Sequence, residues 1–217
     1  MVHRMYVPSH FVNQDLGQLQ AMMRRHPFAL LVTAHGGRTH LSHLPFHLDA
    51  TRGAMGTLEA HLAKANPHAE AIAAGGPCTV VFQGPDAYVS PRWYVDPAKN
   101  VPTWNYVAVH VHGVPRPVTG AEALLALIGR LTDEHEAYIE QPWSIREAQA
   151  HAEHLARHIL GFTLEIESLE GKYKLSQNRS DGDRAGVLRE FAKLGSDDAG
   201  EMLELMHGLY TADGKRR

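Results

Sequence analysis

The feature that most constrains the fold is a series of short strand patterns joined by tight turns. Phe28–Thr33 is a short apolar run, Gly36-Gly37 is typical of a hairpin turn, and Thr39–Asp49 alternates between two faces. Further strands are expected at Thr57–Leu62 and Thr103–His112. Because strands and helices do not alternate regularly along the chain, the pattern predicts an antiparallel sheet rather than a parallel doubly wound one.

Helices are expected in the middle and at the end of the chain. Asn66-Pro67 is typical of a helix start, with Asn66 as the cap, and Gly75-Gly76 ends that helix. An amphipathic helical pair is expected between Ser180 and Leu209. Two further helices are predicted by matches to the capping box, in Thr119 with Glu122 and in Ser144 with Glu147. The predicted fold class is therefore α+β.

Two further turns and the domain boundaries are expected from the sequence. Cys78–Gln83 and Ala87–Ser90 are expected to form a hairpin around Gly84-Pro85-Asp86, because Gly and Pro are strong turn residues. Phe162–Ser168 alternates as a strand does, and a turn is expected at Glu170-Gly171. No linker or repeat divides the chain. Residues 1–179 are therefore expected to form one domain, with residues 180–217 as a helical extension packed on it.

The composition gives no electrostatic attraction to nucleic acid. The 217 residues carry 21 Lys and Arg against 24 Asp and Glu, a formal net charge of −3, which does not draw a protein toward DNA or an anionic membrane. The single cysteine, Cys78, is expected to be a small buried hydrophobe in a reducing compartment. No run approaches the ~18 apolar residues of a membrane span, and Met1–Tyr6 lacks the apolar core of a signal peptide. A cytoplasmic location is expected.

Motifs of the common catalytic classes are absent from the sequence. It has no phosphate-binding glycine loop, no dinucleotide fingerprint, no serine-hydrolase elbow and no zinc-protease motif. Instead, five unusual strings stand where strands end, and they combine polar donors, aromatic rings and lysines. The strings are Ser42–Phe46, His61–Pro67, Gly84–Tyr94, Val101–Tyr106 and Lys174–Arg179. Such groups suit a planar, partly apolar ligand with an anionic tail.

With these strings in order, and with Met5–Phe11 before them, the sequence resembles the PaiB-like family of FMN-binding negative transcriptional regulators. The resemblance implies an antiparallel split β-barrel of the FMN-binding type, with helical insertions and a C-terminal helical pair. It also implies a homodimer with FMN between the subunits. The chain departs from the family pattern at Ala60 and Lys64, where Gly and Arg are expected. Lysine keeps the charge but loses the bidentate hydrogen bonding of arginine.

Nine residues of these strings are candidate contacts of FMN: Ser42, His43, His61, Lys64, Asn66, Trp104, Tyr106, Lys174 and Gln177. Lys64 precedes the helix that Asn66 is expected to cap, so its ammonium and the first helix amides can share one phosphate. Ser42 and His43 point to opposite faces of their strand, so only one of them meets the ring by its side chain. The resemblance also implies a relation to the pyridoxamine-phosphate oxidases, and Lys174 resembles the basic residue that contacts FMN near the end of those proteins.

Each of these candidates also has a plain structural explanation. Lys64 is equally compatible with a surface lysine, and His43 with a histidine in the barrel wall. Trp104 and Tyr106 suit packing in the core or at the dimer interface as well as stacking on a flavin ring. No residue of the sequence demands a catalytic role.

Two groups of histidines offer a rival chemistry. His151, His154 and His158 are spaced so that they share one helix face. No acidic or cysteine partner is evident beyond Glu147, so a solvated face without metal is expected. His110 and His112 share a strand face with Tyr106. This keeps haem binding open, because some split-barrel relatives bind haem through histidine.

Three functions remain open from the sequence. They are an FMN-binding negative regulator of transcription, a flavin-dependent oxidoreductase acting on a small molecule, and a haem-handling protein of the same fold. Direct reading of DNA is disfavoured, because Asp197–Leu209 carries four acids and no Lys or Arg. A regulatory role is therefore expected to be indirect, through the redox state of the flavin or through a DNA or protein partner.

Overall fold

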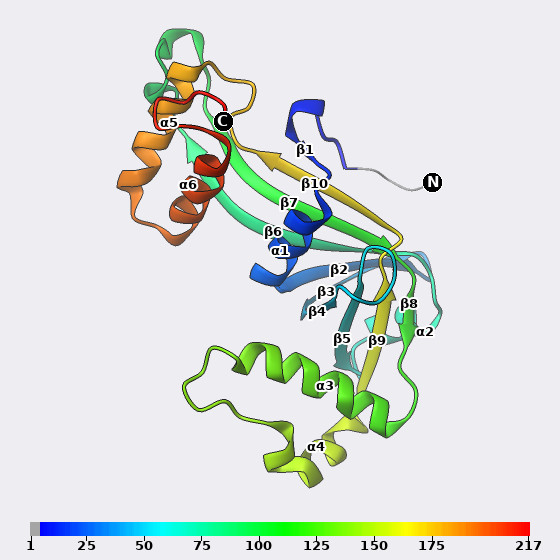
Figure 1. Ribbon diagram of the computed structural model, residues 1–217. Coiled ribbons are helices and arrows are strands. Elements are labelled where there is room, and N and C mark those ends of the chain that lie inside the picture. Colours follow the sequence, from blue (N-terminus) through cyan, green and yellow to red (C-terminus); the bar gives the residue numbers. More distant parts are fainter. Residues whose placement is uncertain (1–4) are drawn as a thin grey trace. The chain divides into compact units, whose positions relative to one another are not determined.

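Residues 5–217 are described by a computed structural model; Met1–Arg4, part of the segment judged for a signal peptide, lie outside the described residues. The described chain forms two antiparallel sheets and six α-helices (Figure 1). The larger sheet has the strand order β1-β10-β7-β6-β2-β3, and the smaller has the order β4-β5-β9-β8. The predicted α+β class with antiparallel sheets is confirmed.

The strands of the larger sheet are β1 (Val12–Asn13), β2 (Phe28–His35), β3 (Arg38–Pro45), β6 (Cys78–Val89), β7 (Thr103–Gly113) and β10 (Ser168–Lys174). Those of the smaller sheet are β4 (His47–Asp49), β5 (Thr57–Ala63), β8 (Pro115–Pro117) and β9 (Ile159–Glu165). The helices are α1 (Leu16–Arg25), α2 (His68–Ala73), α3 (Ala121–Glu136), α4 (Gln149–Ala156), α5 (Asp181–Leu194) and α6 (Asp197–Leu209).

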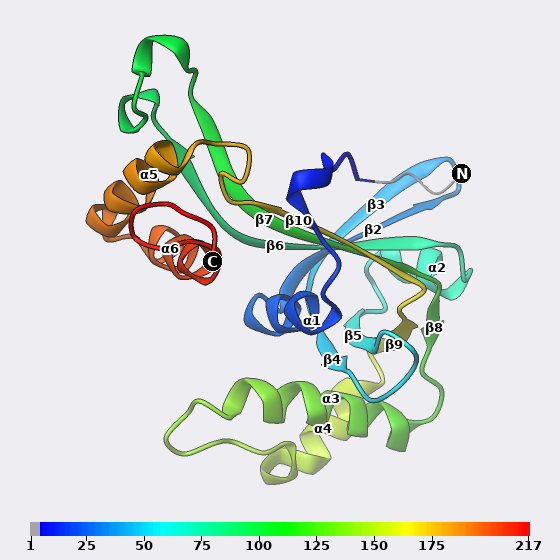
Figure 2. The same cartoon turned by 45° about the horizontal axis from the view of Figure 1, so that its top comes forward.

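The chain divides into two compact units that alternate along the sequence. The central unit consists of Asp15–Phe82 and Val109–Leu169. The terminal unit consists of the segment ending at Gln14, together with Gln83–Ala108 and Glu170–Arg217. Each of the long strands β6 and β7, seen from a second direction in Figure 2, contributes one part to each unit.

The core of the central unit follows from the alternation of apolar residues along its strands. Leu44, Phe46 and Leu48 are all buried, as the pattern of Thr39–Asp49 predicts. The ring of Phe46 packs edge-on against Phe82 and Phe162, with centroids 5.8 Å and 6.2 Å away. Such edge-to-face contacts add to the burial of the rings themselves. Cys78 is buried as expected, and burial raises the pKa of its thiol to about 12.

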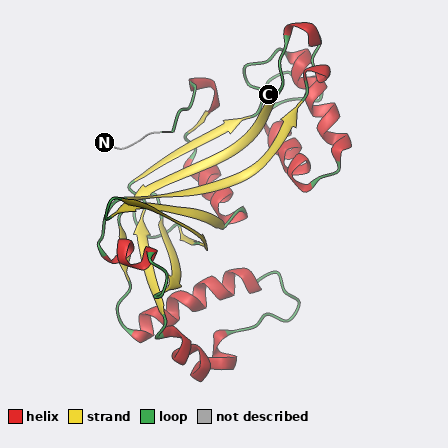
Figure 3. Ribbon diagram, turned by 180° about the vertical axis from the view of Figure 1, so that it is seen from behind, coloured by secondary structure: helices red, strands yellow, loops and turns green. Residues whose placement is uncertain are grey.

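Helices α3 and α4 pack beside the smaller sheet (Figure 3). Helix α3 buries one apolar stripe, formed by Leu124, Leu127 and Leu131. The predicted capping box of Ser144 and Glu147 is also present, and it opens a 3₁₀ turn at Ile145–Ala148 that leads into α4. The box predicted at Thr119 and Glu122 is wrong. Helix α3 starts after Gly120, whose φ of 91° is natural for glycine, and no side chain caps it.

Two predicted turns are wrong because sheet pairing overrides local turn preference. Gly84-Pro85-Asp86 does not close a hairpin but lies inside the continuous strand β6. Gly84 and Pro85 are both buried, so the alternation of the strand shifts by one residue at the proline, which has no N–H to donate. Glu170-Gly171 is likewise inside β10, where Gly171 pairs with Asn13. The chain bends earlier instead, between β9 and β10, as it passes from one sheet to the other.

Helix α1 is absent from the sequence prediction. Its signal is Asp15, whose carboxylate accepts a hydrogen bond from the N–H of Gln18 at 3.0 Å. Its buried residues, Leu19, Met22 and Met23, fall at helical spacing. The helix predicted at Asn66-Pro67 is present as α2, and its regular part begins at His68.

The terminal unit is built around the predicted pair α5 and α6, which pack on each other. Gly186 allows the loop at Trp93 to approach α5, because a Cβ at this position would lie 1.9 Å from the Trp93 carbonyl oxygen. The Trp93 ring then meets Phe191 edge-on at 5.8 Å. Arg184 is buried in the same unit and donates to the carbonyl oxygen of Gly214 at 2.7 Å.

A buried carboxylate joins α3 to the smaller sheet. Glu59 on β5 is 1% exposed. Arg130 of α3 donates to both of its oxygens, at 2.8 Å and 3.0 Å. Arg52 donates to Oε1 at 3.0 Å. Beside this cluster, His47 and Glu134 are hydrogen bonded at 2.6 Å, and this bond raises the pKa of His47.

We expect Arg130→Met to lower the free energy of unfolding by about 2 kcal/mol, because it leaves a buried carboxylate with one partner instead of two. Urea unfolding of the variant measures the loss. Arg116→Met, at an exposed position on β8, is the matched control and should change stability little. A loss no larger than that of the control would mean that Arg130 does not compensate Glu59.

Candidate functional site

The nine sequence-predicted residues fall into both units. Five lie in the central unit: Ser42, His43, His61, Lys64 and Asn66. Four lie in the terminal unit: Trp104, Tyr106, Lys174 and Gln177. Within the central unit Asn66 is hydrogen bonded to Ser42, and within the terminal unit the ammonium of Lys174 lies over the ring of Tyr106.

A buried polar network joins β2, β3 and α2 in the central unit. His68 is 1% exposed, and its Nδ1 lies 2.8 Å from Ser42 Oγ while its Nε2 lies 2.9 Å from Thr33 Oγ1. The amide of Asn66 donates to the same Ser42 oxygen at 3.2 Å, and its Oδ1 accepts the N–H of His68 at 2.9 Å. Two predicted residues, Ser42 and Asn66, are therefore linked. His68, which is hydrogen bonded to both of them, belongs to no sequence prediction, although it directly follows Asn66-Pro67.

The environment of His68 favours its neutral form. Burial lowers its pKa, and nearby His40, with ring centroids 5.5 Å apart, lowers it further. A neutral imidazole has one donor and one acceptor nitrogen, and hydroxyl groups can satisfy both because each hydroxyl donates and accepts. The network thus fixes the loop that carries Lys64 without needing a charge.

Ser42 and His43 point to opposite faces of β3, as the sequence predicts. Ser42 is buried in the network, whereas His43 is exposed and stacks on the exposed ring of Phe28 at 6.1 Å. Neighbouring Leu41 is 61% exposed. His43 therefore belongs to an open, partly apolar face of the β2–β3 hairpin.

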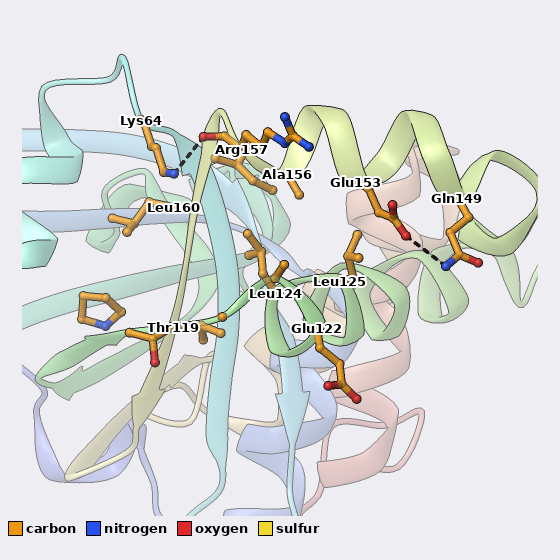
Figure 4. A pocket seen from close by; sticks show the side chains of 15 residues that line it. Lys64, Thr119, Glu122, Leu124, Leu125, Gln149, Glu153, Ala156, Arg157 and Leu160 are labelled. Carbon is orange, nitrogen blue, oxygen red and sulfur yellow. Dashed lines mark hydrogen bonds between the residues drawn. The ribbon is translucent and has the colours of Figure 1, made fainter.

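Lys64 opens onto a cavity of the central unit, about 730 Å³ in volume (Figure 4). Its ammonium donates to the carbonyl oxygen of Arg157 at 2.8 Å. The start of α3 lines the same cavity, from Thr119 to Glu122. Since no side chain caps α3, its first N–H groups remain available there. Lys64 therefore shares a pocket with the start of α3, whereas the start of α2 was expected. The first N–H of α2, that of His68, donates instead to Asn66.

His61 lines a second cavity of the central unit, about 290 Å³ in volume, with residues of α3 and α4. Its Nδ1 is buried without a hydrogen-bond partner, and burial lowers the pKa of the ring. Its neighbours on β5, Ala60 and Leu62, are buried in the barrel core. His61 and Lys64 therefore serve different pockets.

Two lysines of the terminal unit, one of them the candidate Lys174, lie beside the ring of Tyr106. The ammonium groups of Lys172 and Lys174 lie 5.1 Å and 6.0 Å from its ring centroid. Lys174 also donates to the hydroxyl of Thr103. The pKa of Lys174 is lowered by burial, and then by the positive charges of Lys172 and Arg179. Cations gathered in this way favour a bound anion, which would relieve their mutual repulsion.

Gln177 and Trp104 have different surroundings. Gln177 accepts from the N–H of Leu175 at 2.7 Å and donates to the carbonyl oxygen of Tyr173, so it closes the turn after β10. Within that turn Ser176 has a φ of 65°, the one positive value among the described non-glycine residues, and Asn105 donates to its hydroxyl at 3.0 Å. Trp104 is 51% exposed and meets Tyr88 edge-on.

The histidines weighed as metal ligands lie on an exposed face. His151 and His154 lie on α4 and His158 lies just after its end, and all three are exposed. Among residues 5–217, no group of three or more His, Cys, Asp or Glu is placed to hold a metal ion. In the same range, no helix is long and apolar enough to cross a membrane.

Solved structures with the same fold identify its class. The chain is similar to a FAD and haem binding protein from Mycobacterium smegmatis, with a TM-score of 0.56 and 17% identity over 75% of this chain and 73% of that one. It is also similar to the flavocytochrome Anf3 from Azotobacter vinelandii, with a TM-score of 0.56 and 13% identity over 77% and 72% of the two chains. The fold is the antiparallel split barrel of flavin-binding proteins, as the resemblance implies.

The family is shown by sequence. Residues 5–168 match the family described as "Putative FMN-binding domain". The chain is 30% identical to the Bacillus subtilis protein named "Protease synthase and sporulation protein PAI 2", over 93% of this chain and 96% of that protein. The chain therefore belongs to the PaiB-like family of FMN-binding domains.

The residues around Lys64 fit the requirements of FMN. A cavity of about 730 Å³ lies within the usual size range of cofactor sites, roughly 300–1,000 Å³. Its walls include Leu124 and Leu160, which suit an apolar ring system. A lysine and uncapped helix amides suit a phosphate.

We expect the free energy of unfolding to fall with acid partly through His68. A folded-state pKa below its ordinary value means that His68 contributes stability above about pH 6.5, and that this contribution is lost as pH falls below that value. In His68→Gln the decrease between about pH 7.5 and 5.5 should be smaller than in wild type. Urea unfolding at both pH values measures it. Exposed His43→Gln is the control, and an equal decrease in wild type and both variants would contradict this role of His68.

Proposed function

We propose that the protein binds FMN non-covalently, with Lys64 contacting the phosphate. The observation that carries the proposal is that the family match covers the His61–Pro67 string, whose lysine opens onto a cofactor-sized cavity beside the start of α3. Lys64 supplies the positive charge, and the first N–H groups of α3 supply hydrogen-bond donors. Ser42, Asn66 and His68 hold the Lys64 loop in place by their buried hydrogen bonds.

A second set of contacts is proposed in the terminal unit. Lys174 and Lys172 present positive charge beside Tyr106, whose ring offers a stacking surface. Trp104 adds exposed aromatic surface, and Gln177 holds the turn that follows Lys174. When bound, FMN supplies hydride and electron transfer, and the protein supplies position and electrostatics.

A homodimer is part of the same proposal. The β2–β3 hairpin exposes Phe28 by 65% and Leu41 by 61%, with His43 on the same face. Val32 pairs with Leu41, so this surface continues across both strands. A contiguous exposed apolar face is typical of an interaction site, and a second copy of the chain is its proposed occupant.

A role in transcription is proposed to be indirect. The Bacillus subtilis relative is named "Protease synthase and sporulation protein PAI 2", and the similarity covers 96% of that protein. The first turn of α6 carries Asp197 and Asp198, and Glu204 is also exposed. These charges oppose the docking of a phosphate backbone. Flavin state or a partner protein is therefore the proposed route of regulation. Neither a substrate nor haem is favoured by a specific contact.

Lys64→Ala should weaken FMN at least about tenfold and riboflavin much less, because only FMN carries the phosphate that Lys64 is proposed to meet. Flavin fluorescence titration measures both affinities. Lys193→Ala, whose lysine is exposed on α5 and paired with Glu190, is the control and should bind both flavins as wild type does. Equal losses for the two flavins would remove Lys64 from the phosphate site.

The protein alone should bind double-stranded DNA only weakly, with a Kd of about 10⁻⁴ M or poorer at physiological salt. The reason is that few phosphates can be neutralised by a chain of net charge −3 whose basic run is Lys215–Arg217. Fluorescence anisotropy with a labelled duplex measures this at several salt concentrations. Nanomolar binding to a specific duplex would show that regulation is direct.

A further inference from the structure

The turn of residues 175–179, which joins β10 to α5 in the terminal unit, has a backbone conformation that needs support. Ser176 lies in the left-handed region with a φ of 65°, which a residue with a side chain keeps only where its surroundings fix it. The buried amide of Asn105 donates to the Ser176 hydroxyl at 3.0 Å. The N–H of Arg179 donates to the Ser176 carbonyl oxygen, also at 3.0 Å. Because the turn directly follows Lys174, its conformation helps to fix the backbone of that lysine.

Gln177 ties this turn to both neighbours of Lys174. Its side-chain amide donates to the carbonyl oxygen of Tyr173 at 2.5 Å, and its side-chain oxygen accepts the N–H of Leu175 at 2.7 Å. The backbone on each side of Lys174 is thus bonded to one side chain. The ammonium of Lys174 in turn donates to the hydroxyl of Thr103. A displacement of Gln177 would therefore move Lys174 as well.

A second segment, the loop of residues 210–217, packs on the same part of the terminal unit. Gly214 lies against the first turn of α5, and a Cβ at this position would stand 2.0 Å from the carbonyl oxygen of Asp181. The guanidinium of Arg184, which is 5% exposed, donates to the carbonyl oxygen of Gly214 at 2.7 Å. The same guanidinium donates to the carbonyl oxygen of Arg179, so it joins the loop to the end of the turn.

We propose that Arg216 is a positioning residue for Lys174. Its guanidinium donates to the carbonyl oxygen of Gln177 at 3.1 Å, so the fixed loop of residues 210–217 holds the residue that ties both neighbours of Lys174. A hydrogen bond from a charged donor is stronger than one between neutral groups. The inference rests on the proposed contact of Lys174 with FMN, and it adds a residue outside the family match, which ends at residue 168.

The first arm of the test follows the turn in flavin-free protein. Arg216→Ala should speed amide hydrogen exchange in residues 175–179 roughly threefold, measured by mass spectrometry, because the turn opens more often without its support. Arg216→Lys, which can still donate to the carbonyl oxygen of Gln177, should restore most of the protection. Lys215→Ala is the matched control. It removes a neighbouring charge that is paired with Asp213, and it should leave the exchange unchanged.

The second arm measures FMN affinity by flavin fluorescence titration. Arg216→Ala should weaken FMN roughly threefold, the effect expected of one lost hydrogen bond, whereas Lys215→Ala should not. In the Lys174→Met background, Arg216→Ala should have no further effect, because its effect passes through Lys174. A merely structural role of Arg216 would weaken FMN equally in both backgrounds.

Three results would overturn the inference. They are exchange in Arg216→Ala that equals that of wild type, an effect that Lys215→Ala reproduces in full, and an equal loss of FMN affinity in both backgrounds. Unchanged FMN affinity in Lys174→Met would instead refute the proposed contact of Lys174 with FMN. Absence of FMN binding to wild type would refute the proposed function, and the exchange arm would still decide whether Arg216 holds the turn.

Discussion

The buried carboxylate of Glu59 is the interaction on which both cavities depend. It lies on β5 with two arginine partners, and one of them, Arg130, belongs to α3. A carboxylate removed from water is tolerated only if charge and hydrogen bonds replace the lost solvation. The ion pair between Arg130 and Glu59 therefore holds α3 against the smaller sheet. Because α3 walls the cavity of Lys64 and the cavity of His61, its position determines whether either can form.

The polar groups of the candidate residues differ, within each unit taken by itself, in how far they are hydrogen bonded. Around Ser42, Asn66 and His68, donors and acceptors meet one another, so this network is a rigid support for the Lys64 loop. The Nδ1 of His61 lacks a partner, and the ammonium of Lys174 is partly desolvated among other cations. Repelling cations of this kind are where an anionic ligand gains the most, since the protein has already lost part of their hydration.

Much of the fold could be predicted from the sequence, because burial on one face gives a period of two that Leu44, Phe46 and Leu48 follow. Turns were predicted less well from local residue types than strands were from alternation. Gly84-Pro85 and Glu170-Gly171 read as turns, yet pairing with neighbouring strands keeps both extended. The strings around Lys64 and Lys174 give the residues of the proposed site, which stay a prediction. Which residues touch there could not be predicted, because the contact of His68 with Thr33 spans 35 positions and depends on how α2 packs on the sheet.

A stoichiometric titration shows whether the protein is a flavoprotein. Flavin-free protein is titrated with FMN while the absorption spectrum and the flavin fluorescence are recorded, and the mass in solution is measured by light scattering. We expect saturation at one FMN per chain in a particle of two chains, with a flavin spectrum. Saturation with haem but not with FMN, or no binding of either, would contradict this expectation.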